Sequence, residues 1–214
     1  IFSRMLKRIL CLYFFIIPLL NTYSQSPDYD IFRQKSVLNP ADSHKIFFKI
    51  ENLTLFKNTE FFNPIAEGHT YLGYILRPSF IYQPTHNTSM QVGMHLLKYS
   101  GINGFSQTLP FFRFQYRITP HIDLVMGNIY STLNHRMIEP MYAFDRYLEN
   151  NLESGMQFLF DYKRYKGDLW MNWEKFIDFN DPHKEQFSVG HTTEFLLTNP
   201  AKPLRVALPI QFLF

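Results

Sequence analysis

The segment "NHRMIEPMYAFDRYLENN" (134–151) contains residue types that act in acid–base and metal chemistry. His135 and Glu139 could serve as a general base and the carboxylate that orients it, or as two metal ligands. The segment contains no serine, threonine or cysteine nucleophile, and no third ligand lies directly beside this pair in the sequence. The simpler interpretation is therefore a loop folded over the mouth of the protein, with internal ion pairs. His95, earlier in the chain, is a further catalytic candidate.

The stretch "DLWMNWEKF" (168–176) contains residue types that bind sugars. If it is a strand, Trp170, Asn172 and Glu174 share one face, where an indole could stack on a sugar ring beside an amide and a carboxylate. The alternative is a tryptophan at a membrane boundary, where an apolar ring with a polar N–H is stable.

The stretch "DFNDPHKEQ" (178–186) contains oxygen and nitrogen ligands. Asp178, Asp181 and Glu185, together with His183, could hold a divalent cation, but the glycine and strict spacing of an EF-hand are missing. A solvated loop is the default interpretation. The chain has no G-x-S-x-G, Walker, H-E-x-x-H or dinucleotide motif, so we expect no cofactor.

The elements that position these residues alternate in polarity. In "SMQVGMHLLKY" (89–99), Met90, Val92, Met94 and Leu96 fall on one side, as in a β-strand. Similar segments follow one another with almost no helical pattern between them, at 44–54, 71–82, 89–97, 108–118, 122–131, 152–162, 168–177, 187–197 and 204–214. The pattern predicts an all-β fold, an antiparallel up-and-down meander of about nine strands.

The lengths of these elements favour a membrane protein. Most are roughly 10–12 residues long, whereas soluble strands average about 5–6 residues and tilted membrane strands need about 9–11. Long and short connections also alternate, as the loops and turns of outer-membrane barrels do. Residues 44–214 are therefore expected to form a partial or complete transmembrane β-barrel, with the apolar face outward and a narrow lumen crossed by ion pairs.

The register of one hairpin follows from parity. The apolar residues of 108–118 and 122–131 have even numbers, so partners on a shared face must sum to an even number. A three-residue turn at 119–121 would place Arg117 opposite Asp123 and Tyr116 opposite Leu124. Pro78 lies inside a predicted strand, where we expect a bulge or an early end.

The N-terminus resembles a secretory signal. Lys7 and Arg8 precede the apolar run 9–20, and small residues suit cleavage before Gln25. We expect residues 1–24 to be a signal peptide that starts at Met5 after upstream read-through, and 25–43 to be an irregular lead. The single cysteine, at position 11, lies within the apolar run, so the mature chain has no disulfide.

Removal of this signal also removes the excess positive charge. Three basic residues leave with it and no acidic one, so Lys and Arg fall from 21 to 18 against 18 Asp and Glu, and the formal charge falls from +3 to zero. A nucleic-acid partner is therefore not expected. Nine strands is an odd number, whereas bacterial barrels have even counts, so we expect the chain to be truncated at 214.

This architecture, with the local stretches "NHRMIEPMY" and "DLWMNWEKF", resembles outer-membrane β-barrel proteins of Gram-negative bacteria, of a Bacteroidota type. The resemblance implies an outer-membrane location, with outer-membrane lipid and the envelope assembly machinery as partners. It assigns no catalytic residue.

Three functions remain open at this point. The favoured one is a non-enzymatic barrel in transport, surface binding of a glycan or small molecule, or envelope structure. The second is an outer-membrane lipid hydrolase or acyl-transfer enzyme, which needs a Ser or Thr hydroxyl near His135, Glu139 or His95. The third is a secreted glycan-binding β-sandwich.

Overall fold

The computed structural model describes residues 35–36, 38–60, 68–143, 145–149, 152–179, 181–199, 201 and 204–214. The chain divides into two units, Ile1–Arg33 and Gln34–Phe214, and the described residues belong to the second. The predicted signal peptide and the lead up to residue 34 lie outside the described residues. None of the helices in the described part has the length and apolar character needed to cross a bilayer.

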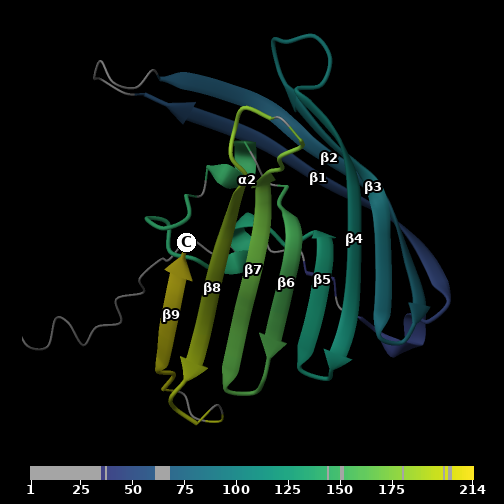
Figure 1. The fold of residues 1–214 in the computed structure, drawn as a ribbon, viewed down its shortest axis with the longest axis vertical. Helices are drawn as coiled ribbons and strands as arrows, with labels where there is room; N and C mark the ends of the chain where they lie inside the picture. Colours follow the sequence, from purple (N-terminus) through teal and green to yellow (C-terminus); the bar gives the residue numbers. More distant parts are fainter. Residues whose placement is uncertain are drawn as a thin grey trace, which may run out of the picture. The chain divides into compact units, whose positions relative to one another are not determined.

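Nine antiparallel strands form one sheet in chain order, which confirms the predicted meander (Figure 1). Their bounds are β1 Lys45–Thr59, β2 His69–Thr85, β3 Thr88–Tyr99, β4 Gln107–Thr119, β5 Ile122–Asn128, β6 Ser154–Asp161, β7 Tyr165–Lys175, β8 Gln186–Leu196 and β9 Ala207–Leu213. Each predicted segment corresponds to one strand. The sheet forms because alternating side chains give each strand one apolar and one polar face.

The sheet has a loop end and a turn end. Long connections lie at the upper end in Figure 1, after β1, β3, β5 and β7, and the tight turns after β2, β4 and β6 lie at the lower end. The connection between β8 and β9 is the exception, because it is long and lies at the turn end. The loops after β5 and β7 therefore begin at the same end, although His135 reaches back to Asp168, near the turn end of β7.

The apolar side chains point away from the concave side of the sheet. Met90, Val92 and Met94 are 39%, 55% and 40% exposed, whereas Gln91 and His95 between them are 3% and 1% exposed. The predicted outward direction of this strand face is confirmed. The distribution is the reverse of a water-soluble sheet, which buries its apolar face.

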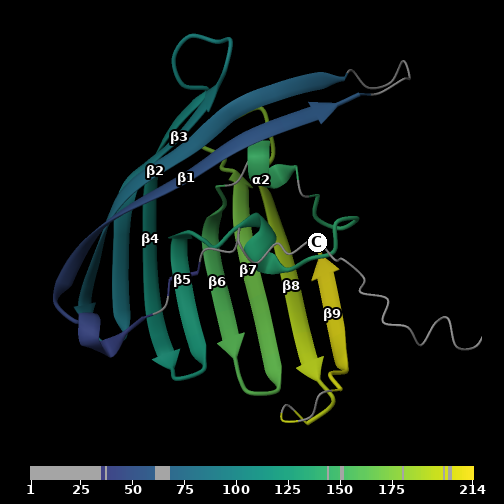
Figure 2. The same ribbon diagram turned by 180° about the vertical axis from the view of Figure 1, so that it is seen from behind.

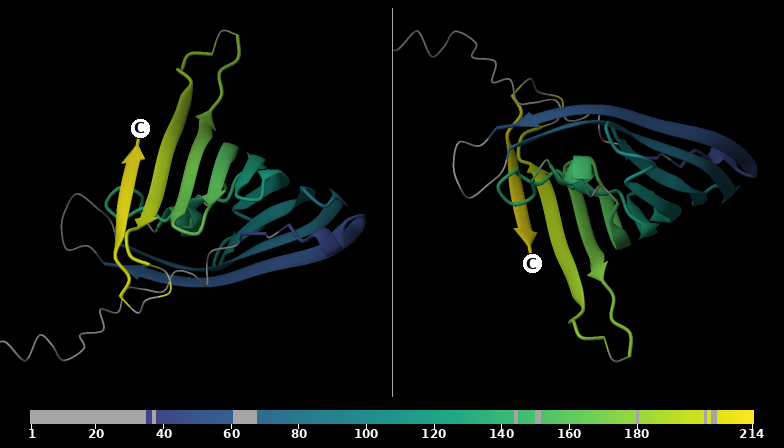
Figure 3. Two further views of the ribbon diagram at one scale, coloured as in Figure 1. Left: turned by 90° about the horizontal axis from the view of Figure 1, so that it is seen from below. Right: turned by 90° about the horizontal axis from the view of Figure 1, so that it is seen from above.

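The sheet curves strongly but does not close. Viewed along the strands, β1 and β2 swing round toward the side on which β9 lies (Figure 3). The pairings of the described residues place β1 and β9 at the two edges, with no ladder between them. A nine-strand closure of 204–214 onto 44–54 is thus not present in this part of the chain.

The described residues of 129–153, which we call the inner segment, lie over the concave face (Figure 2). The segment contains a 3-10 helix, η4 (Thr132–His135), and a short helix, α2 (Arg146–Glu149). Asp145 forms an ion pair with Lys57 on β1 at 2.8 Å, and Gln211 on β9 donates to the carbonyl of Arg136 at 2.9 Å. The inner segment therefore connects the first strand to the last.

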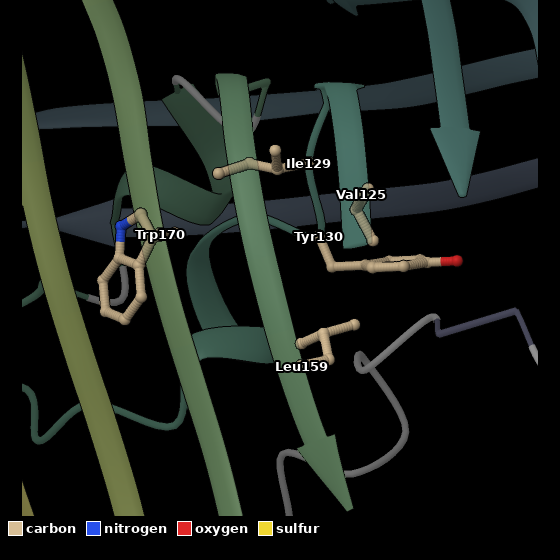
Figure 4. Packing of buried hydrophobic residues seen from close by; sticks show 5 residues of the cluster. All are labelled: Val125, Ile129, Tyr130, Leu159 and Trp170. Atoms are coloured by element: carbon tan, nitrogen blue, oxygen red, sulfur yellow. The ribbon is translucent and has the colours of Figure 1, made fainter. Parts of the chain in front are cut away.

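Two small apolar clusters anchor this segment. Val125 of β5, Leu159 of β6 and Trp170 of β7 pack with Ile129 and Tyr130 at the start of the inner segment (Figure 4). A second cluster on β1–β3, made of Leu55, Ile75 and Leu97, packs against Leu148 of α2.

The predicted hairpin register is correct, but its turn is not. Arg117 pairs with Asp123, and its Nε lies 3.0 Å from Oδ1 of Asp123. The strands end at Thr119 and begin at Ile122, which leaves two turn residues instead of three. A register shift between Arg117 and Thr119 absorbs the extra residue, as a bulge does.

The bulge or early strand end expected at Pro78 is also absent. β2 continues through Pro78, which pairs with Ile50 of β1. The pairing of β2 with β3 skips Arg77 and Pro78 but continues in the same register on both sides of them. Proline has no N–H to donate to the neighbouring strand, but its backbone angle fits an extended strand. The irregularity in β2 lies between Tyr82 and Thr85.

Candidate functional site

The most enclosed polar group in the described residues is centred on His135, at the end of η4. Its Nδ1 lies 2.9 Å from Asp168 Oδ2 on β7, and its Nε2 lies 2.8 Å from Glu153 Oε2. The ring stacks on Trp170 with centroids 3.7 Å apart. His135 is fully buried.

The charges around this ring keep it protonated. Burial by itself disfavours the charged imidazole, but the charges and hydrogen bonds of Asp168 and Glu153 outweigh it and raise the pKa of His135 to about 9. An imidazolium with both N–H groups donated to carboxylates cannot accept a proton from a substrate. The predicted general base is therefore a cation at neutral pH, and its geometry suits an anchor for the inner segment.

The other catalytic candidates lie apart from this group. Glu139 is exposed, and the carboxylates at His135 come from Glu153 and Asp168 instead. His95 is buried on the concave face of β3, where its Nδ1 accepts from Arg77 at 3.2 Å. The Arg77 guanidinium also donates to Glu51 at 2.8 Å.

The predicted sugar-binding residues share the concave face of β7. Trp170 and Asn172 are buried and Glu174 is exposed. The indole of Trp170 is covered by His135 on one side, and on the other side Gly190 is so close that a Cβ there would overlap the indole. Asn172 accepts from the backbone of Ser154 at 2.9 Å. Both are thus occupied by contacts within the protein.

The acidic residues after β7 are only partly brought together. The backbone N–H of Asp178 donates to Asp181 at 2.8 Å, and His183 lies 3.7 Å from the same Asp181 carboxylate. Glu185 instead accepts from the indole of Trp173 at 2.8 Å. Among the described residues, no group of three or more His, Cys, Asp or Glu side chains has a metal-binding arrangement.

A second polar pair lies on the outward face of β8. Gly190 and Thr192 are buried on the concave side, so His191 and Thr193 point the other way, with Phe187 and Phe195. Their cross-strand neighbours on β9 are Phe212 for His191 and Ile210 for Thr193, both about half exposed.

The local contacts of this pair are few. The His191 ring lies 5.3 Å from the Phe212 ring, and its Nδ1 is buried with no hydrogen-bond partner in the described part of the chain. The Thr193 hydroxyl donates to the carbonyl of Lys166 at 3.1 Å. An ionisable ring in the apolar phase of a strand is costly where that phase faces a membrane, and such residues are functional candidates.

Sequence reasoning missed this pair. The strand at 187–197 was expected, and its phase already places "HTT" with His191 and Thr193 on the side of Phe195. The available signal was a histidine and a hydroxyl, two residues apart, in the apolar phase of a strand. This pattern indicates a functional site only once the apolar phase of the strand is known to face outward.

These features define an all-β protein, a single antiparallel meander with apolar residues outside and a filled polar interior. The chain matches the family model described as Lipid A 3'-O-deacylase-type over residues 38–214, and it belongs to this family. Comparison with curated proteins and with solved structures gives no match.

Proposed function

We propose that the protein is an outer-membrane ester hydrolase that removes an acyl chain from lipid A or a closely related acylated glycolipid. The family description names this reaction class, and the outward apolar side chains suit a sheet embedded in lipid as the wall of a barrel. The proposed partners are outer-membrane lipid and the machinery that inserts barrels.

The position of His191 and Thr193 is the observation that carries this proposal. An enzyme that cleaves an acyl ester in a bilayer must present its reactive groups to the lipid, not to the lumen. His191 and Thr193 lie in the outward phase of β8, where Thr193 is 6% exposed, whereas both ring nitrogens of His135 are occupied in the interior. The requirement for a hydroxyl near a histidine is therefore best met on β8.

The reaction follows the logic of a hydroxyl nucleophile activated by a neighbouring base. The Thr193 hydroxyl turns from the Lys166 carbonyl toward His191, which takes its proton, and Oγ1 attacks the ester carbonyl carbon. The bond to the sugar oxygen breaks, and the imidazolium returns the proton to that oxygen. Water activated by His191 then hydrolyses the acyl-threonine and releases the fatty acid.

Mass spectrometry of lipid A from Gram-negative cells that express the full chain tests the proposal. We expect lipid A to lose the mass of one acyl chain. The variants His191→Ala and Thr193→Val should slow this loss about 100-fold or more, and Thr193→Ser should retain it, because serine keeps the hydroxyl.

Thr54→Ala is the matched control, since Thr54 is an exposed hydroxyl on β1, far from β8 in the sheet order. It should not change the rate. The proposal would be overturned if lipid A is unchanged in cells with the wild-type chain, or if wild type and His191→Ala deacylate it at equal rates. The non-enzymatic barrel function would then be favoured.

A further inference from the structure

We propose that the inner segment positions the outward pair through β8, with His135 and Thr192 as positioning residues. This inference rests on the proposed function. The proposed connection runs through the backbone of β8, from side chains in the polar interior to side chains on the membrane-facing side.

Three strands are tied to the inner segment at the same level. Asp168, Thr192 and Gln211 are cross-strand neighbours on β7, β8 and β9, and all three point inward. Each binds one of two adjacent residues of the inner segment, His135 or Arg136. Asp168 accepts from the His135 ring at 2.9 Å, the Thr192 hydroxyl donates to the His135 carbonyl at 2.5 Å, and Gln211 donates to the Arg136 carbonyl at 2.9 Å.

The His135 end of this connection is held rigidly. The ring is enclosed by the carboxylates of Glu153 and Asp168 and by the stacked indole of Trp170. Arg146 of α2 lies 4.0 Å from Glu153 and adds a positive charge. A buried cluster of opposite charges resists displacement, because moving the His135 ring would leave the Asp168 and Glu153 carboxylates without their hydrogen bonds.

Thr192 lies between His191 and Thr193 in the chain, so the interior contact is made at the centre of the proposed reactive pair. The outward face touches lipid, which is fluid and cannot hold a side chain in one place. Reactive groups must be kept within about 0.5 Å of their working geometry by a supporting shell. On β8 this shell consists of the interior contact of Thr192 and the hydrogen bond from the Thr193 hydroxyl to the Lys166 carbonyl.

The test uses Thr192→Val, which removes the hydroxyl at nearly constant volume, and Thr192→Ser, which keeps it. We expect Thr192→Val to lower kcat about tenfold with KM within about twofold, and Thr192→Ser to restore kcat. Ser188→Ala is the matched control, because Ser188 is an inward hydroxyl of β8 that donates to Glu174 and not to the inner segment. It should leave kcat unchanged.

A second measurement does not depend on catalysis. The rate at which diethyl pyrocarbonate acylates the His191 ring depends on the position and exposure of that ring. This rate is measured by peptide mass spectrometry on the protein in detergent. Thr192→Val should change this rate about threefold or more, and Ser188→Ala should not. If Thr192→Val does not fold, Gln211→Ala, which removes the β9 contact at the partly exposed edge, replaces it in both measurements.

The two proposals fail in different ways. A wild-type chain without deacylation, but with a His191 labelling rate that responds to Thr192→Val, overturns the hydrolase and supports the positioning contact. If His191→Ala abolishes activity while Thr192→Val equals Ser188→Ala in kcat and in labelling, the positioning role is overturned and the hydrolase stands.

Discussion

At the scale of single residues, His135 shows how a buried charge can hold a loop. Its ring carries one positive charge between two carboxylates, and Arg146 supplies a second positive charge near Glu153. Buried ions are expensive to desolvate, but removing one member of such a cluster is more expensive, because the others remain unpaired. His135 therefore links the inner segment to β7 most strongly while it is protonated, because neutral imidazole has only one N–H to donate.

This linkage predicts a pH-dependent stability. The folded-state pKa of about 9 is above the ordinary value of 6.5, so the stabilisation is complete below pH 6.5 and is lost as the pH rises through 9. It amounts to about 3 kcal/mol at most. Thermal unfolding in detergent should show the wild-type Tm falling between pH 6.5 and 9.5, and His135→Gln should lack this fall. If the Tm of wild type and the Tm of His135→Gln change with pH in the same way, the prediction is contradicted.

At the scale of elements, β8 has two faces with different surroundings. Its concave face is fitted to the interior, because Gly190 lies directly under the Trp170 indole and Thr192 binds His135. Its outward face carries His191 and Thr193 among aromatic residues. The glycine is required here by the close approach of the indole, since any Cβ would overlap the ring.

A methyl group at this position should therefore disturb the interior. Gly190→Ala should push Trp170 away from the strand and destabilise the fold by about 1–3 kcal/mol, as overpacked cores do. Gly167→Ala is the control, because its Cβ would first meet the end of the Tyr165 side chain at 2.9 Å, which can swing aside. Thermal unfolding should show a clearly larger loss for Gly190→Ala. Equal losses for the two variants would argue against the packing described.

At the scale of the whole molecule, the described unit is inverted relative to a soluble protein. Large apolar side chains are exposed along the outer face of the sheet, and amides, charges and hydroxyls are buried inside. A continuous apolar surface of this kind needs an apolar environment. The concave side is occupied by the inner segment and crossed by its contacts to β1 and β9.

Introducing a charged side chain on the outer face of the sheet distinguishes a membrane protein from a soluble one. Val92, 55% exposed at the middle of β3, should tolerate arginine in water, but in a bilayer Val92→Arg should cost about 2–4 kcal/mol. We expect a lower yield in the outer-membrane fraction and a lower Tm. Ile102→Arg is the control, since Ile102 is 47% exposed in the loop after β3. Normal yield for both variants would favour the soluble β-sandwich.

Alternation along the chain was sufficient to predict the nine strands, their antiparallel order and, in segments with one clearly apolar phase, which side chains share a face. Strand geometry is local, so a period of two in residues 89–97 already separates Met90 from Gln91. The pairing of Arg117 with Asp123 was also predictable, because six residues and one turn leave few registers. The bulge that shortens this turn was not, since its cost depends on local backbone detail.

The partners of His135 and the importance of His191 were decided by the tertiary structure. Many carboxylates were equivalent candidates for His135, and Glu153 and Asp168 reach it only because the inner segment folds back onto β7. His191 was visible as one member of an alternating strand, but its significance depends on the outward direction of that face and on Thr192 binding the interior. Contacts between distant segments depend on how the whole sheet curves, and a period of two does not encode that curvature.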